Sequence, residues 1–209
     1  MTDKNRPHYT AFLGPTRLAA GPLAEVAIAV MQASRRPAAP PIIIFSNATG
    51  QPIDLDLRGT ERDVIARLPK PATPANAEPE EATSTEPRGR GRPKLGVVAR
   101  EVTLLPRHWE WLNAQPGGAS VALRKLVEEA RRAHQGQDRV RRSQEATYRF
   151  MSVMAGNRPG FEEATRALFA GHRERFERLV EPWPRDVRNH ARKLAAAALD
   201  ADAQAQSRS

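Results

Sequence analysis

The first third of the chain alternates between strand-like and helix-like patterns of apolar residues. Residues 8–13 and 16–20 flank a Gly-Pro turn and predict a β-hairpin. Apolar residues at helical spacing over residues 22–35 predict a helix. The β-branched run at residues 41–45 predicts a strand that is buried on both faces.

A second strand and a second helix follow this run. Ile and Leu alternate with Asp over residues 53–57, which predicts a half-exposed partner strand. Thr60 stands where it can cap a helix over residues 61–68. The resulting order, ββαββα, predicts a small α+β domain over residues 1–69.

Residues 69–86 contain mainly Pro, Ala, Thr and Glu and have no apolar periodicity. Such a segment has too little apolar surface to offset the entropy lost on ordering, so we expect a disordered linker. Together with the basic stretch after it, this linker covers residues 70–96.

The carboxyl-terminal half is mostly helical in pattern and starts with one predicted strand, at residues 97–105. A first helix is predicted over residues 106–115 and a second over 120–133, with Ser120 as the N-cap of the second. In these helices Trp109 and Trp111 are expected to be core or interface residues.

Further apolar stripes predict several helices within residues 134–200. The last helix is predicted to open at Pro184, and residues 201–209 are expected to form a disordered polar tail. Its inward positions are Val187, Ala191, Leu194 and Ala198.

Composition limits the class of protein. With 209 residues, 40% of them apolar and 27% charged, the chain suits two small folded units joined by a linker. It has no cysteine, which excludes disulfides and thiolate metal sites. The first residues lack the apolar core of a signal peptide and no run reaches membrane-spanning length, so we expect a cytoplasmic protein with no membrane partner.

The net charge of +9 is concentrated in one quarter of the chain. Residues 88–142 contain thirteen Lys and Arg against five Asp and Glu, a net charge of +8. Arginines number 28 and lysines 5, so most of this charge is on planar guanidinium groups. A concentrated basic segment favours a nucleic-acid partner.

The basic segment opens with PRGRGRPKLG, residues 87–96, in which glycine and proline separate the cations. This stretch resembles the AT-hook, a peptide that binds the minor groove of A·T-rich double-stranded DNA. The groove is roughly 6 Å wide and admits only thin, extended peptide. The alternative is a basic hinge between domains. The DNA-binding residues that the resemblance implies are Arg88, Arg90, Gly91, Arg92, Pro93 and Lys94.

The strand, helix, turn and helix over residues 97–133 resemble the ribbon-helix-helix family of bacterial repressors and antitoxins. The resemblance implies a homodimer whose paired strands enter the major groove, with Arg100 and Thr103 near the DNA. Backbone amides near Ser120 would bind a phosphate, with Arg124 and Lys125 one turn further on. The alternative is an ordinary helical hairpin with Trp109, Leu112 and Leu126 in its core.

The stretches PRGRGRPKLGVVAREVTLLPRHWEWL and GFEEATRALFAG resemble an uncharacterised bacterial domain-of-unknown-function family. That resemblance extends over most of the chain and implies no activity.

The sequence predicts neither an enzyme nor a cofactor. Its five histidines lack metal-ligand spacing, and no Gly-rich phosphate loop follows a strand. His190 lies close to Arg188 and Arg192 in sequence and is expected at the surface.

The leading hypothesis is a nucleoid-associated DNA-binding protein, either a transcriptional regulator or an architectural protein, that is a homodimer through residues 97–133. A different class of function is a protein-interaction adaptor that binds a protein partner through its amino-terminal or carboxyl-terminal region. RNA is a third alternative, because arginine-rich segments bind both nucleic acids.

Overall fold

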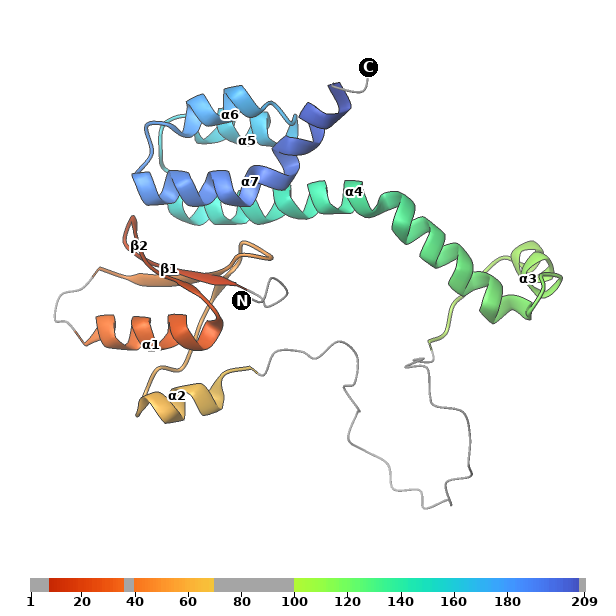
Figure 1. Cartoon of the computed structure of the whole chain (residues 1–209), viewed down its shortest axis with the longest axis horizontal. Helices are drawn as coiled ribbons and strands as arrows, with labels where there is room; N and C mark the ends of the chain where they lie inside the picture. The colour runs from red at the N-terminus through yellow and green to blue at the C-terminus, as the bar shows by residue number, and fades with distance from the viewer. Residues whose placement is uncertain (1–7, 36–39, 70–99, 207–209) are drawn as a thin grey trace, which may run out of the picture. The chain divides into compact units, whose positions relative to one another are not determined.

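A computed structural model describes residues 8–35, 40–69 and 100–206 of the chain, with side chains up to residue 200 (Figure 1). The fold is mixed α+β, with a small amino-terminal antiparallel sheet and a mostly helical carboxyl-terminal half, as predicted. The elements of the first part follow the predicted order, ββαββα.

Four antiparallel strands form one sheet in the order β2-β1-β3-β4. The predicted hairpin and the predicted central strand are both confirmed, and Ala11 pairs with Ile44 in the register between β1 and β3. Alternation along β3 sends Ile44 to one face and Phe45 to the other, and both are buried. The strands are β1 (Tyr9–Leu13), β2 (Thr16–Gly21), β3 (Ile42–Ser46) and β4 (Pro52–Ile53).

Two helices belong to the amino-terminal part, α1 (Leu23–Ser34) and α2 (Glu61–Arg67). Val26 and Val30 of α1 pack against the face of the sheet that carries Ile44. Thr60 caps α2 as predicted, because its hydroxyl accepts a hydrogen bond from the Asp63 amide, 3.3 Å away.

The carboxyl-terminal half contains five helices among the described residues. They are α3 (Pro106–Asn113), α4 (Gly118–Ala155), α5 (Phe161–Phe169), α6 (Arg173–Val180) and α7 (Arg185–Gln206).

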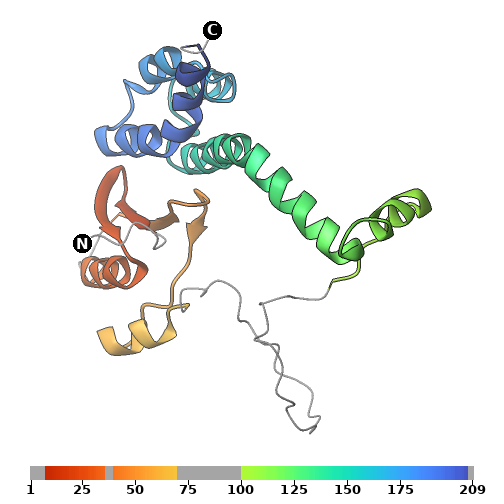
Figure 2. The same ribbon diagram turned by 45° about the vertical axis from the view of Figure 1, so that its right-hand side comes forward.

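The second face of the sheet packs against α4 and α7 (Figures 1 and 2). Phe150 of α4 lies with its ring centre 5.4 Å from that of Phe12 and 5.0 Å from that of Phe45. All three rings are completely buried. The sheet is therefore the middle layer between α1 and the pair formed by α4 and α7.

Residues 1–68 and 131–209 form one compact unit, and residues 69–130 form a second. Sequence reasoning treated residues 1–69 and 134–200 as separate segments. The structure joins them through a common core because the two apolar faces of the sheet both need to be covered.

The Ser143 side chain of α4 forms two hydrogen bonds with the backbone of α7. Its hydroxyl donates to the Leu194 carbonyl, at 2.6 Å, and accepts from the Ala198 amide, at 3.2 Å. These two backbone groups would otherwise bond to each other in a regular helix. An inserted side chain of this kind bends a helix, and α7 is visibly bent in Figure 1.

Two helices extend beyond their predicted carboxyl-terminal ends. The helix predicted to stop at Ala133 continues to Ala155, because no Pro or capping residue interrupts it and Gly136 costs a helix only about 1 kcal/mol. The tail predicted to begin at Ala201 remains helical to Gln206, because Ala, Gln and Asp continue a helix without a stop signal.

Replacing Gly50 with alanine should strongly destabilise the larger unit. Gly50 has φ +67°, and an added Cβ would lie 1.8 Å from the carbonyl oxygen of Ala146 on α4. The turn after β3 would have to move away from α4. We expect a loss of roughly 3 kcal/mol in the free energy of unfolding, measured by urea denaturation.

Gly136→Ala is the matched control, since an added Cβ there meets nothing within 4 Å. It should raise helix stability by about 1 kcal/mol. Equal effects of the two substitutions would contradict the close approach of Gly50 to α4.

Candidate nucleic-acid interface

The residues of the hook-like stretch lie outside the described residues. These are Arg88, Arg90, Gly91, Arg92, Pro93 and Lys94. Their assignment to DNA therefore remains a prediction from the sequence.

The strand predicted at residues 97–105 is absent from its described part, residues 100–105. Arg100 and Thr103 are both exposed there. A strand needs a hydrogen-bonded neighbour, and this segment has none among the described residues of the single chain. Residues 100–105 of the single chain thus do not form the expected ribbon strand.

Ser120 is not the N-cap of the second helix, contrary to the prediction. The helix α4 begins at Gly118, so Ser120 lies inside its first turn. Gly117 and Gly118 have φ angles of +88° and +73°, and the Gly118 amide donates to the Gln115 carbonyl at 2.9 Å. Two glycines with positive φ turn the chain here, and they allow the helix to start two residues early.

Arg124 and Lys125 are both exposed on α4. Because helical residues advance by about 100°, Arg124 lies about 160° and Lys125 about 100° around the helix from Leu126. Glu128 lies four residues after Arg124, and Glu129 lies four residues after Lys125. The carboxylates offset much of the positive charge of this turn.

The positive charge of residues 88–142 is divided between two clusters. Residues 100–130 contain four Lys and Arg and four Glu, a net charge of zero. Residues 88–94 carry +4 and residues 131–142 carry another +4. In the second cluster Arg139, Arg141 and Arg142 are exposed, and Arg141 forms an ion pair of 2.7 Å with Asp138.

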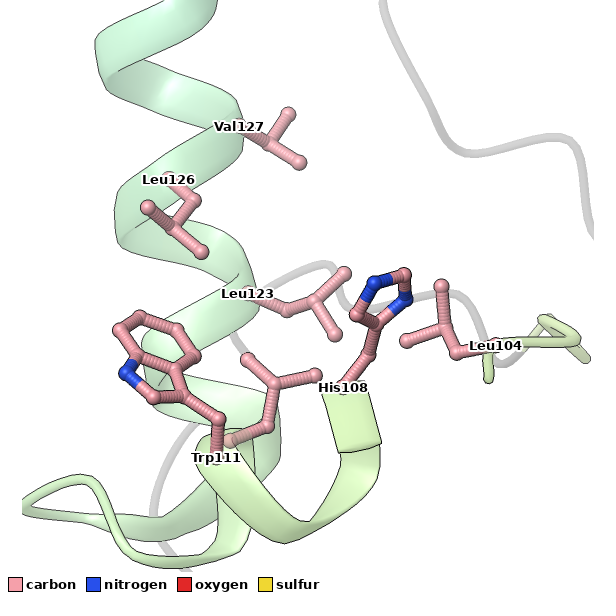
Figure 3. A pocket seen from close by; sticks show the side chains of 7 residues that line it. Leu104, His108, Trp111, Leu123, Leu126 and Val127 are labelled. Carbon is pink, nitrogen blue, oxygen red and sulfur yellow. The ribbon is translucent and has the colours of Figure 1, made fainter. Parts of the chain in front are cut away.

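An apolar groove, which sequence reasoning missed, lies between α3 and the start of α4 (Figure 3). Leu112 is 4% exposed, so this residue is core as the helical-hairpin interpretation predicted. Leu126 is 44% exposed and Trp111 is 53% exposed, so neither is core within the chain. The groove has a volume of about 340 Å³ and is lined by Leu104, His108, Trp111, Leu112, Leu123, Leu126 and Val127.

His190 is buried, not at the surface as predicted. It is 4% exposed, and its ring centre lies 4.6 Å from that of Phe150 and 5.4 Å from that of Phe12. Its Nε2 atom has no hydrogen-bond partner. Burial lowers the pKa of His190 from its usual 6.5 to about 4, and the positive charges of Lys193 and Arg17 add to the effect.

The described part of the chain has neither a membrane-spanning helix nor a cluster of metal ligands. None of its helices has the length and apolarity to cross a membrane. No three histidine or carboxylate side chains in these residues come together as a metal site.

Residues 8–195 match the model of the DUF2239 family, described as an uncharacterised protein conserved in bacteria. Because the match covers most of the chain, the protein belongs to this family. The predicted membership of an uncharacterised bacterial family is thereby confirmed. No curated protein and no solved structure matches the chain significantly.

Acidification should destabilise the fold through His190. The unfolded chain takes up a proton near pH 6.5, whereas the folded chain resists protonation until about pH 4. Stability is thus full above pH 6.5 and falls as the pH decreases towards 4. Between pH 7 and pH 5 we expect a loss of roughly 2 kcal/mol, measured by urea denaturation at each pH.

His190→Leu should remove most of this pH dependence, and the exposed His134→Leu should retain it. The interval above pH 5 avoids the titration of Asp56, because hydrogen bonds from Arg58 hold the pKa of that carboxyl near 2. An unchanged pH dependence in His190→Leu would assign the loss to another group.

Proposed function

We propose that this protein binds double-stranded DNA, with a preference for A·T-rich minor grooves, and acts as a regulator or an architectural protein. The observation that carries the proposal is the net charge of +8 over residues 88–142. That charge falls in two clusters of +4, each compact enough to meet several phosphates.

The first cluster suits a narrow groove. Arg90 and Arg92 are separated by Gly91, which has no side chain to obstruct entry. A narrow A·T groove has a strongly negative potential, which favours an inserted guanidinium. Arg88 and Lys94 then contact phosphates on either side.

The second cluster supports the proposal from the described part of the chain. Arg139, Arg141 and Arg142 are exposed on α4 within four residues. Side chains of this kind contact phosphates without reading sequence. They add affinity for any duplex, whereas the first cluster supplies the preference for A·T pairs.

Two other functions remain as alternatives. An adaptor that binds a protein partner would retain that partner after nuclease treatment and after deletion of residues 88–94. An RNA-binding protein would prefer structured RNA over an A·T duplex in direct competition.

Arg90→Ala with Arg92→Ala should weaken binding to an A·T duplex more than binding to a G·C duplex. The reason is that only the A·T groove has the narrow, negative slot that these side chains fill. Fluorescence anisotropy with the two labelled duplexes measures both affinities. Arg62→Ala with Arg166→Ala is the matched control, since it removes the same charge from exposed helical positions outside residues 88–142.

The affinity for duplex DNA should also fall steeply with salt. If each hook neutralises about four phosphates, the two hooks of a dimer contribute about −7 to the slope of log affinity against log salt, and phosphate contacts of the second cluster add to it. The double substitution should make the slope less steep by about 4, because four contacts are lost per dimer. A slope near zero for the unaltered protein, or equal affinity for A·T and G·C duplexes, would overturn the proposal.

A further inference from the structure

The groove between α3 and α4 leaves large apolar side chains in contact with water. Trp111 is 53% exposed, Leu126 is 44% exposed and Val127 is 59% exposed. They are contributed by two helices and surround one hollow, as Figure 3 shows. A contiguous apolar surface of this kind marks an interaction site more often than scattered exposed residues do.

The two helices have too small a core to be stable without further contacts. Among the described residues from 100 to 130, only Leu112 and Ala122 are buried apolar side chains. Two buried side chains cannot offset the entropy lost by ordering α3 and the first turns of α4. The described residues provide no further apolar surface over these two helices, so an additional one is needed to complete this core.

The charges around the groove favour a second copy of the same chain. Residues 100–130 carry four positive and four negative side chains, so two copies meet without net repulsion. A partner with charges of only one sign would gain little electrostatic attraction from residues of mixed charge. The lining itself has one polar side chain, His108, so it offers little chemistry to select a small polar ligand.

The shape of the surface favours the same partner. Trp111, Leu126 and Val127 line the groove and keep about half of their surface exposed, so they are accessible to a second copy. In a two-fold pair, these side chains of each copy would contact the same surface of the other, as an isologous contact requires.

We infer that the α3–α4 groove is a homodimer interface, in which Trp111, Leu126 and Val127 of each copy fill the groove of the other. This helical interface replaces the paired strands that the ribbon-helix-helix resemblance implied. The dimer does not require DNA, and it doubles the number of basic segments that one particle presents.

Sedimentation equilibrium of the full chain without DNA tests the dimer. We expect a mass of twice 23.1 kDa for the unaltered protein. Leu126→Glu with Val127→Glu should weaken association by a factor of about 30 or more, because charged groups would enter an apolar interface. The control is Val153→Glu, which alters a valine of α4 that is 46% exposed and lies outside the groove. Circular dichroism checks that the variants keep their helices.

A second measurement avoids introduced charges. The chain has no cysteine, so Val127→Cys provides one reactive thiol per copy. A bismaleimide should link two copies of Val127→Cys efficiently and two copies of Val153→Cys poorly. A monomer at every concentration, or a dimer that is linked equally well through both positions, would overturn the inference.

These results are separable from DNA binding. A dimer without preference for A·T duplex supports the interface and contradicts the proposed function. A monomer that prefers A·T duplex supports the proposed function and contradicts the interface.

Discussion

The contact of Phe150 with Phe12 and Phe45 is the interaction on which the larger unit depends. It joins a strand near the amino terminus to a helix more than a hundred residues later. Without it the small sheet would have one face covered by α1 and the other face exposed. The approach is close because Gly50 has no side chain to hold the turn after β3 away from α4. Two short segments of modest apolar content thereby form one core.

Local patterns predicted the elements of the amino-terminal part well, because hairpins, caps and strand alternation depend on neighbouring residues. The cap at Thr60 and the burial of β3 on both faces, through Ile44 and Phe45, are examples, whereas the strand predicted at residues 53–57 is formed only at Pro52–Ile53. What covers the second face of the sheet was not predictable from local patterns, since it comes from distant helices. His190 was misplaced for a different reason. Its arginine neighbours suggested a polar face, yet two residues along a helix span about 200°, which places His190 with Val187 and Ala191 instead.

The helix α4 shows why the candidate site was harder to predict than the fold. Its later residues, from Ser143 to Ala155, pack against the sheet and α7, whereas Leu126 and Val127 face water with the same apolar periodicity. Periodicity identifies an apolar face but not the partner that covers it. The pattern therefore assigned Leu126 to a core, whereas this residue is 44% exposed. The two tryptophans of α3, Trp109 at 38% and Trp111 at 53% exposure, carried the same ambiguity, because large aromatic residues occur both in cores and in interfaces.

The distribution of charge indicates that DNA binding and self-association use different residues, although the sequence analysis assigned both to residues 97–133. Arg124 and Lys125 are each followed by a glutamate at i+4, so their turn of α4 contributes little net potential towards a phosphate backbone. The neighbouring groove is lined mainly by apolar side chains, which do not bind a phosphate but favour contact with another apolar surface. Under the proposed function, counterion release must come from residues 88–94 and 131–142, on either side of the neutral segment in sequence. If residues 100–130 of two chains associate, the dimer carries twice as many basic clusters as one chain. Because these associating segments have no net charge, their contact would not interfere with the binding of the basic clusters to DNA.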